Sequence, residues 1–229
     1  MSDVRLVIVC MPADTCAGWF SASEILNRHR LATSIPVPMF PVRRRAISGV
    51  ISRWSARHLV HPVRRRAAVA LAAGGRLRRL DLTAAATLAH ADAVYRWRVW
   101  SHVVARIPAA RPPRDFRADH RLTAEQAVRQ FEAQPRVLAM LAHNCHPHAR
   151  VPLHLQELEA YQAGEITYSV LHWQRAIAGD AMVTDDGGLL EPASDSLADR
   201  LRYLAHAAAY LRALPQDRHI VAVHAAPRP

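Results

Sequence analysis

Apolar residues recur at intervals of three and four positions through most of the sequence from residue 83 to residue 214. An α-helix has 3.6 residues per turn, so residues with this spacing line one of its sides. The longest uninterrupted pattern ends just before Pro108 and predicts a helix over 83–107, with Thr83 as its N-cap. The apolar side of this helix consists of Ala93, Trp97, Trp100, Val104 and Ile107.

Two helices are predicted to meet at Pro135. Thr123 and Gln126 have the spacing of a capping box, in which each side chain bonds to the backbone N–H of the other residue. The helix that they begin should end near Gln134, because a proline follows. Pro135 is a favourable first residue for the next helix, which is predicted to run to about Asn144.

The C-terminal part predicts two more amphipathic helices. The first covers 155–178, is weakened by Gly164, and has Gly179 as its stop. Its expected apolar stripe consists of Leu155, Leu158, Ile166, Val170, Trp173 and Ile177. The second begins at Ser196, has Asp199 in its first turn and runs to Leu214. Its seam consists of Leu197, Leu201, Leu204, Ala208 and Leu211.

Strands are expected in few places. Residues 4–10 are apolar and β-branched, residues 219–223 have the same character, and a DDGG turn predicts a hairpin over 182–190. The first and last of these segments are candidates to pair with each other. The expected fold class is therefore mainly α, with a few short strands and an irregular arginine-rich N-terminal region.

The front of the chain carries the sequence PVRRRA twice, at 41–46 and at 62–67. Three prolines within 36–41 favour an extended linker before the first copy, and the residues between the copies predict a short basic amphipathic helix. The glycine pair at 74–75 then interrupts the pattern. We therefore expect a basic region over 1–79 and a helical domain over 80–229.

Charge is divided unequally along the chain. All 30 basic residues are arginine, so their total reflects overall residue usage as much as function, and their placement is more informative. Residues 1–121 hold 21 arginines and 7 acidic residues, whereas 122–229 hold 9 and 12. A region this positive attracts polyanions, and the arginine head group can bond two phosphate oxygens at once.

We therefore expect a non-enzymatic protein that binds nucleic acid, DNA or RNA, through the phosphate backbone. The arginines expected to make these contacts are Arg43, Arg44, Arg45, Arg53, Arg57, Arg64, Arg65, Arg66, Arg76, Arg78, Arg79, Arg98 and Arg106. An anionic membrane surface or a solvated, partner-facing surface would use the same charges. The alternative function is a helical interaction or assembly subunit, whose apolar helix faces contact a protein partner or a second copy while the arginines serve as a solubilising or docking surface.

A third interpretation is a metal-dependent enzyme. The stretch HNCHPH places His143, Cys145, His146 and His148 close together, and these residue types are zinc ligands. Their spacing matches no zinc signature, so zinc is a secondary expectation and no other cofactor is indicated. The absence of lysine excludes a Walker phosphate loop and a Schiff-base site, and no HExxH or GxSxG occurs. Enzyme activity is therefore not the favoured expectation.

Three cysteines and the N-terminal residues bear on the compartment. An odd, small number of cysteines does not suit a disulfide framework and is typical of a reducing environment. The N-terminus lacks the basic start and longer apolar core of a signal peptide, and no segment approaches the roughly 20 apolar residues of a membrane span. We expect a cytoplasmic protein without a transmembrane segment.

Overall fold

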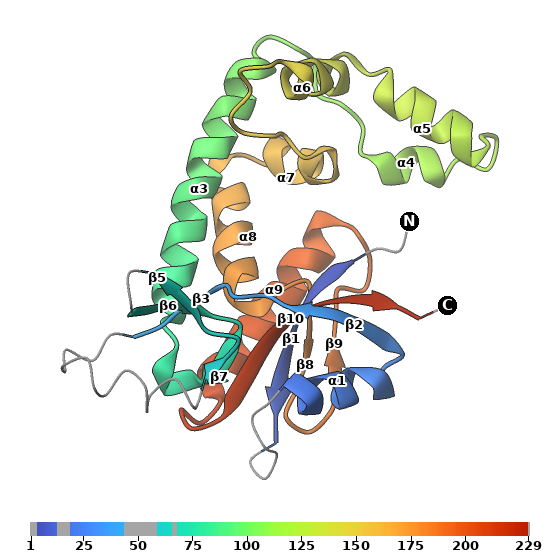
Figure 1. Ribbon diagram of the computed structural model, residues 1–229. Coiled ribbons are helices and arrows are strands. Elements are labelled where there is room, and N and C mark those ends of the chain that lie inside the picture. The colour runs from blue at the N-terminus through green and yellow to red at the C-terminus, as the bar shows by residue number, and fades with distance from the viewer. Residues whose placement is uncertain (1–3, 13–18, 44–58, 66–67, 229) are drawn as a thin grey trace. The chain divides into compact units, whose positions relative to one another are not determined.

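The chain forms two compact units (Figure 1). The computed structural model describes residues 4–12, 19–43, 59–65 and 68–228. The first unit combines Met1–Leu88 with Trp173–Pro229, and the second is Ala89–His172. The two ends of the chain therefore belong to the same unit.

A mixed sheet of seven strands is the centre of the first unit. Its strands are β1 (Arg5–Met11), β2 (Leu31–Pro36), β4 (Leu59–Val60), β7 (Gly74–Arg76), β8 (Ala181–Val183), β9 (Leu189–Leu190) and β10 (His219–Pro227). Six follow the order β4, β7, β10, β1, β8, β9, and β2 also pairs with β10. The strand β10, near the C-terminal end of the sequence, is thus hydrogen-bonded to three strands of its N-terminal part, β1, β2 and β7.

The central pair of the sheet joins the first and last strands of the chain. β1 and β10 are antiparallel, with Arg5 opposite Ala225 and Met11 opposite His219, which confirms the predicted pairing. β8 lies parallel to β1 on its other side, and β8 and β9 form the predicted hairpin. The apolar, β-branched residues of β1 are buried because neighbours cover both edges and both faces of this strand.

Helices cover the two faces of this sheet. Val7, Val9 and Met11 alternate along β1 and pack with Ala22 and Leu26 of α1 (Trp19–Arg28). The intervening residues of β1 point to the opposite face, where the buried side of α9 (Leu197–Ala213) lies. The Ser196 hydroxyl caps α9 by accepting from the Asp199 N–H, which confirms the predicted start of this helix.

Residues 40–79 add a second, smaller sheet to the first unit. It consists of β3 (Phe40–Pro41), β6 (Ala68–Ala72) and β5 (Val63–Arg65), in that order. β7 then joins the large sheet, where Gly74 lies so close to β10 that an added Cβ would be 2.1 Å from the Ile220 carbonyl oxygen. A short 3₁₀ helix, η1 (Leu77–Arg79), follows directly.

The second unit is helical in its described structure. Its elements are α4 (Pro113–Arg117), α5 (Ala124–Glu132), α6 (Pro135–Cys145), η2 (Leu155–Glu157) and α7 (Leu158–Gln162), together with the parts of α3 (Leu82–Val103) and α8 (Glu165–Ala178) that fall within 89–172. The capping box of Thr123 and Gln126 is present, and Pro135 is the first residue of α6, as predicted.

The predicted helix over 155–178 is interrupted. Gly164 has a φ of 103° and separates α7 from α8. The predicted apolar stripe is also wrong at Ile166, which is 80% exposed, and at Val170 and Trp173, which are partly exposed, whereas its last member, Ile177, is buried as expected. Tyr168 and Leu171 are the fully buried residues of α8 in this part of the chain.

The expected fold class is wrong, since the chain is an α/β protein with a large mixed sheet and a second sheet. Several strands have no periodic apolar pattern, as in the sequences VRR of β5 and GGR of β7, so they could not be distinguished from loop. The expected N-cap of α3 is also wrong, because the Asp81 carboxylate, rather than Thr83, accepts from the Ala84 N–H.

Within the described ranges, no helix combines the length and the apolar character that a membrane-spanning segment requires. The basic helix predicted between the two PVRRRA copies falls on residues 44–58, which lie outside the described residues.

Candidate functional site

Five arginines of residues 43–79 have no carboxylate partner among the described residues: Arg43, Arg64, Arg76, Arg78 and Arg79. We call this set the unpaired arginines. Arg43, Arg64 and Arg78 are exposed, while Arg76 and Arg79 are half-buried. An arginine without an anionic neighbour keeps its full charge and its N–H donors available to a ligand.

Backbone hydrogen bonds hold three of the unpaired arginines in one place. The Arg43 N–H donates to the Arg79 carbonyl oxygen at 2.9 Å, which joins the end of β3 to η1. The Arg78 N–H donates to the Gln216 carbonyl oxygen at 2.9 Å, which joins η1 to the turn before β10. Arg43, Arg78 and Arg79 are therefore brought together by the fold of the first unit rather than by their positions in the sequence.

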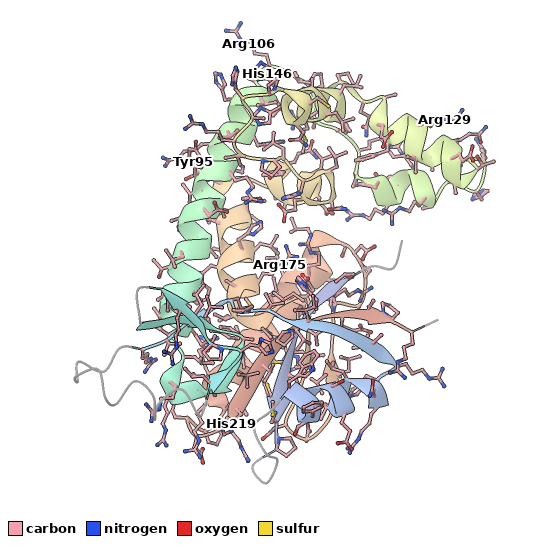
Figure 2. The ribbon with its side chains drawn as sticks, in the orientation of Figure 1. Tyr95, Arg106, Arg129, His146, Arg175 and His219 are labelled. Atoms are coloured by element: carbon pink, nitrogen blue, oxygen red, sulfur yellow. The ribbon has the colours of Figure 1, made fainter. Side chains whose placement is uncertain are left out.

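The other arginines predicted to contact phosphate have different surroundings. Arg44, Arg45, Arg53, Arg57 and Arg66 lie outside the described residues, and only the backbone of Arg65 is described. Arg98 lies 3.6 Å from the Glu165 carboxylate, so its charge is already shared with an acid. Arg106 is exposed at the C-terminal end of α3 and has a φ of 65° (Figure 2).

At least five of the ten arginines of the second unit are paired with carboxylates. The pairs are Arg96 with Asp92, Arg98 with Glu165, Arg111 with Asp115, Arg114 with Glu159 and Arg129 with Glu125. Three of these are four residues apart in sequence, where helical side chains face each other. The first unit forms such pairs too outside residues 43–79, as Arg175 does with Asp180. The arginines described within 43–79 therefore differ from many of those elsewhere in the chain.

A cavity of about 250 Å³ opens beside the unpaired arginines in the first unit. Its apolar wall is formed by Leu77, Leu80, Leu82, Ala86, Ile177, Ala208 and Leu211, and its polar members are Arg43, Thr83, Arg212 and Gln216. Trp173, with 37% of its surface exposed, also lines it. An apolar pocket with a few polar groups is the usual form of a site for a small organic group.

The histidine and cysteine cluster does not form a metal site in the described structure. His143 Nε2 is 3.0 Å from the Val151 carbonyl oxygen, His146 and His148 have ring centroids 5.5 Å apart, and Cys145 is exposed at the end of α6. Among the described residues, no three histidine, cysteine, aspartate or glutamate side chains are placed to hold a metal ion together. Zinc binding stays a prediction with no geometry to support it.

An acidic residue of the predicted DDGG turn has half-buried partners from distant parts of the sequence. Asp185 follows β8, accepts from the Tyr210 hydroxyl and lies 3.4 Å from the Arg218 guanidinium. Cys10 lies nearby, and burial together with the Asp185 charge raises the pKa of its thiol to about 12. A thiol whose pKa is raised in this way is protonated at neutral pH and is a poor nucleophile. The DDGG sequence predicted a turn, but it could not predict that Asp185 contacts Tyr210.

The second unit contains a buried polar and aromatic cluster that the sequence did not predict. Glu157 is 6% exposed, accepts from the Tyr168 hydroxyl at 2.6 Å and lies 3.3 Å from His172 Nε2. Tyr161 stacks on Tyr168 and on Trp100. Burial raises the pKa of Tyr168, and raises that of Tyr161 to about 12. We describe this set as the Glu157 cluster.

Comparisons with protein-family models, with curated proteins and with solved structures found no match. The unpaired arginines and the adjacent cavity of the first unit are therefore the features from which a function is argued.

Proposed function

We propose that this chain binds nucleic acid without catalysing a reaction, and that the unpaired arginines of the first unit contact the phosphate backbone. One observation carries the proposal: the arginine side chains described within residues 43–79 have no carboxylate partner, whereas five of the ten arginines of the second unit are paired with one. The proposal places the protein in a reducing cytoplasm, where the exposed Cys145 thiol would stay free.

The physical reason is the cost of replacing an existing partner. An arginine that contacts a carboxylate must give up that contact before it can bind a phosphate, whereas an unpaired one gives up only water and counterions. The surplus of arginine over acid in residues 1–121 also creates a positive field that attracts a polyanion from a distance. Both effects support backbone contacts that do not depend on base sequence.

A variant with Arg64, Arg78 and Arg79 changed to glutamine tests the proposal. Binding of fluorescently labelled single-stranded and double-stranded oligonucleotides would be measured by anisotropy over a series of salt concentrations. Each lost phosphate contact should lower the slope of log affinity against log salt by about 0.7 to 0.9. We therefore expect weaker binding to every oligonucleotide and a slope smaller by about 2.

The matched control changes Arg98, Arg111 and Arg129 to glutamine. These three arginines are exposed, are paired with acids in the second unit, and their loss changes the net charge by the same amount. The control should bind nearly as tightly as the unchanged chain. Equal losses in both variants would mean that only net charge matters, and no binding by the unchanged chain would reject the proposed function.

A second candidate function rests on exposed apolar residues of α8. Ile166 is 80% exposed and Val170 is 39% exposed, and four residues separate them, so they share one side of the helix. Such residues are typical of a surface that contacts another protein or a second copy. Sedimentation analysis over a range of concentrations tests this function: a mass that rises with concentration and falls in Ile166→Asp supports assembly.

A further inference from the structure

The cavity beside the unpaired arginines is built from four separate elements of the first unit. Leu77 and Leu80 come from η1 and the residue after it, Ala86 from α3, Ile177 from α8, and Leu211 from α9. Each of these side chains is at most 8% exposed. The wall is therefore part of the packed core, and the volume of about 250 Å³ does not depend on a surface loop changing shape.

The polar members of the cavity are held in place by backbone groups. Arg212 Nε donates to the Ala208 carbonyl oxygen at 3.1 Å, so the guanidinium is anchored on α9 and has further N–H groups to offer. Gln216 is fixed through its carbonyl oxygen, which accepts from the Arg78 N–H. No carboxylate of the described residues pairs with Arg212 or with Arg43.

The geometry points to a cavity that takes one unstacked base of a single-stranded nucleic acid, an inference that rests on the proposed function. The volume is slightly below the roughly 300–1,000 Å³ of pockets for drug-sized ligands, so it suits one small ring system. Trp173 supplies an aromatic face for stacking, and Thr83 and Gln216 supply groups that both donate and accept at a base edge.

Charge decides between a base and a purely apolar occupant. Arg43 and Arg212 line the cavity, and Arg78 and Arg79 adjoin Arg43 through the backbone contacts of η1. An occupant that combines a flat apolar part with neighbouring anions would fit these residues, and this is the chemistry of a nucleotide within a strand. Bases of a duplex are stacked and paired, so only an unpaired base can enter.

Three probes of twelve nucleotides would test the inference on the full chain by fluorescence anisotropy: oligo-dT, an abasic strand with the same backbone, and a dT·dA duplex. The abasic strand has the phosphates but no bases. Stacking of a base is worth about 1–3 kcal/mol, so we expect oligo-dT to bind roughly 5- to 150-fold more tightly than the abasic strand. The duplex should bind more weakly than oligo-dT.

Two variants assign this preference to the cavity. Trp173→Ala removes the aromatic face from a partly exposed position, and Thr83→Leu narrows the cavity from an exposed position, so neither disturbs a fully buried side chain. Both should bring the affinity for oligo-dT close to that for the abasic strand. Phe20→Ala is the matched control, because Phe20 is an aromatic residue of the same unit that is 86% exposed on α1.

The outcomes separate this inference from the proposed function. Equal, salt-sensitive binding of oligo-dT and the abasic strand would leave the phosphate contacts intact and overturn the base-binding cavity. A preference for oligo-dT that persists in both cavity variants would overturn it as well. Changing Arg64, Arg78 and Arg79 to glutamine should weaken binding of all three probes. The ratio of the affinity for oligo-dT to that for the abasic strand should stay the same. Failure of every probe to bind would overturn the proposed function and the inference with it.

Discussion

The arginines described within residues 43–79 of the first unit differ from the paired arginines of the second unit in what surrounds them. In the second unit, Arg96 and Arg114 contact carboxylates at hydrogen-bonding distance, and Arg136 lies over the Trp100 ring and donates to the Gln162 side chain. In the first unit, Arg43 and Arg78 are exposed and contact no carboxylate among the described residues. The same residue type therefore contacts an acid or an aromatic ring at these positions of the second unit and leaves its charge available at Arg43 and Arg78.

The difference follows from where acidic residues stand in the sequence. Asp92 and Glu125 precede arginines by four positions on helices, so each pair forms within its own element. Between residues 25 and 80 the chain contains no acidic residue at all. The arginines of that stretch have no local partner, and a charged surface without partners is stable only while it is hydrated or bound to anions.

The largest effect is expected for Trp100→Ala in the second unit. Trp100 is 5% exposed, and its ring centroid lies 5.3 Å from that of Tyr161. Truncation of a buried tryptophan removes this stacking and leaves a cavity, so the free energy of unfolding in urea should fall by about 3–5 kcal/mol. Oligonucleotide affinity of the folded variant should not change.

The control for this change is Tyr95→Ala, since Tyr95 projects from α3 and is 57% exposed (Figure 2). This change should lower the free energy of unfolding by no more than about 0.5 kcal/mol. A loss of oligonucleotide affinity in folded Trp100→Ala would contradict the proposal that the first unit, and not the second, binds the oligonucleotide.

A smaller loss is expected for Tyr168→Phe. The Tyr168 hydroxyl donates to the buried Glu157 carboxylate at 2.6 Å, and phenylalanine leaves that acceptor short of one donor without changing the ring. Urea unfolding should show a loss of about 1–3 kcal/mol. Tyr95→Phe, which removes an exposed hydroxyl, is the matched control and should be neutral. Equal stability of both variants would mean that the Glu157 cluster does not stabilise the fold.

Alkaline pH should weaken the second unit through Tyr161. Burial raises its pKa to about 12, whereas the unfolded chain ionises near the ordinary value of 10. The folded state therefore binds the proton more tightly than the unfolded chain. The contribution of this residue to the free energy of unfolding is fully present below pH 10 and is lost as the pH rises from 10 to 12, at about 1.4 kcal/mol per pH unit. Urea unfolding between pH 9 and 11.5 should therefore be less pH-dependent in Tyr161→Phe than in the unchanged chain. An unchanged pH slope would contradict this role.

Local features of this fold could be predicted from the sequence, and features made by distant partners could not. The capping box of Thr123 and Gln126 and the cap of α9 were predictable because their members are three residues apart. β7 was not, because its sequence is GGR and it is a strand only through its pairing with β10 and β4. The sheet therefore appeared too small, and the fold class was expected to be mainly α.

The candidate site shows the same limit. The sequence identified the arginine-rich segment by composition, but it could not show that Arg98 contacts Glu165 while Arg78 contacts no acid. The cavity was not predictable, because its wall is assembled from residues as far apart as Leu77 and Leu211. Burial of Glu157 was hidden for a similar reason, since Tyr168 and His172 lie on the next helix, beyond the Gly164 break.

The smallest effect, and the sharpest test of the comparison, is expected for Arg114→Gln. Two guanidinium nitrogens of Arg114 contact both carboxylate oxygens of Glu159, and this hydrogen bond raises the pKa of Arg114. The side chains are 44% and 30% exposed, so solvent screens the pair, and its loss should cost no more than about 1 kcal/mol in urea unfolding. A double-mutant cycle with Glu159→Gln measures the interaction energy of the two side chains, which should be positive only if they stabilise each other.

Arg64→Gln in the first unit removes the same charge from an exposed position without a carboxylate partner, so it should leave stability unchanged and lower oligonucleotide affinity instead. Opposite results for these two single changes, one in stability and one in affinity, follow only if pairing with an acid decides what an arginine does in this protein.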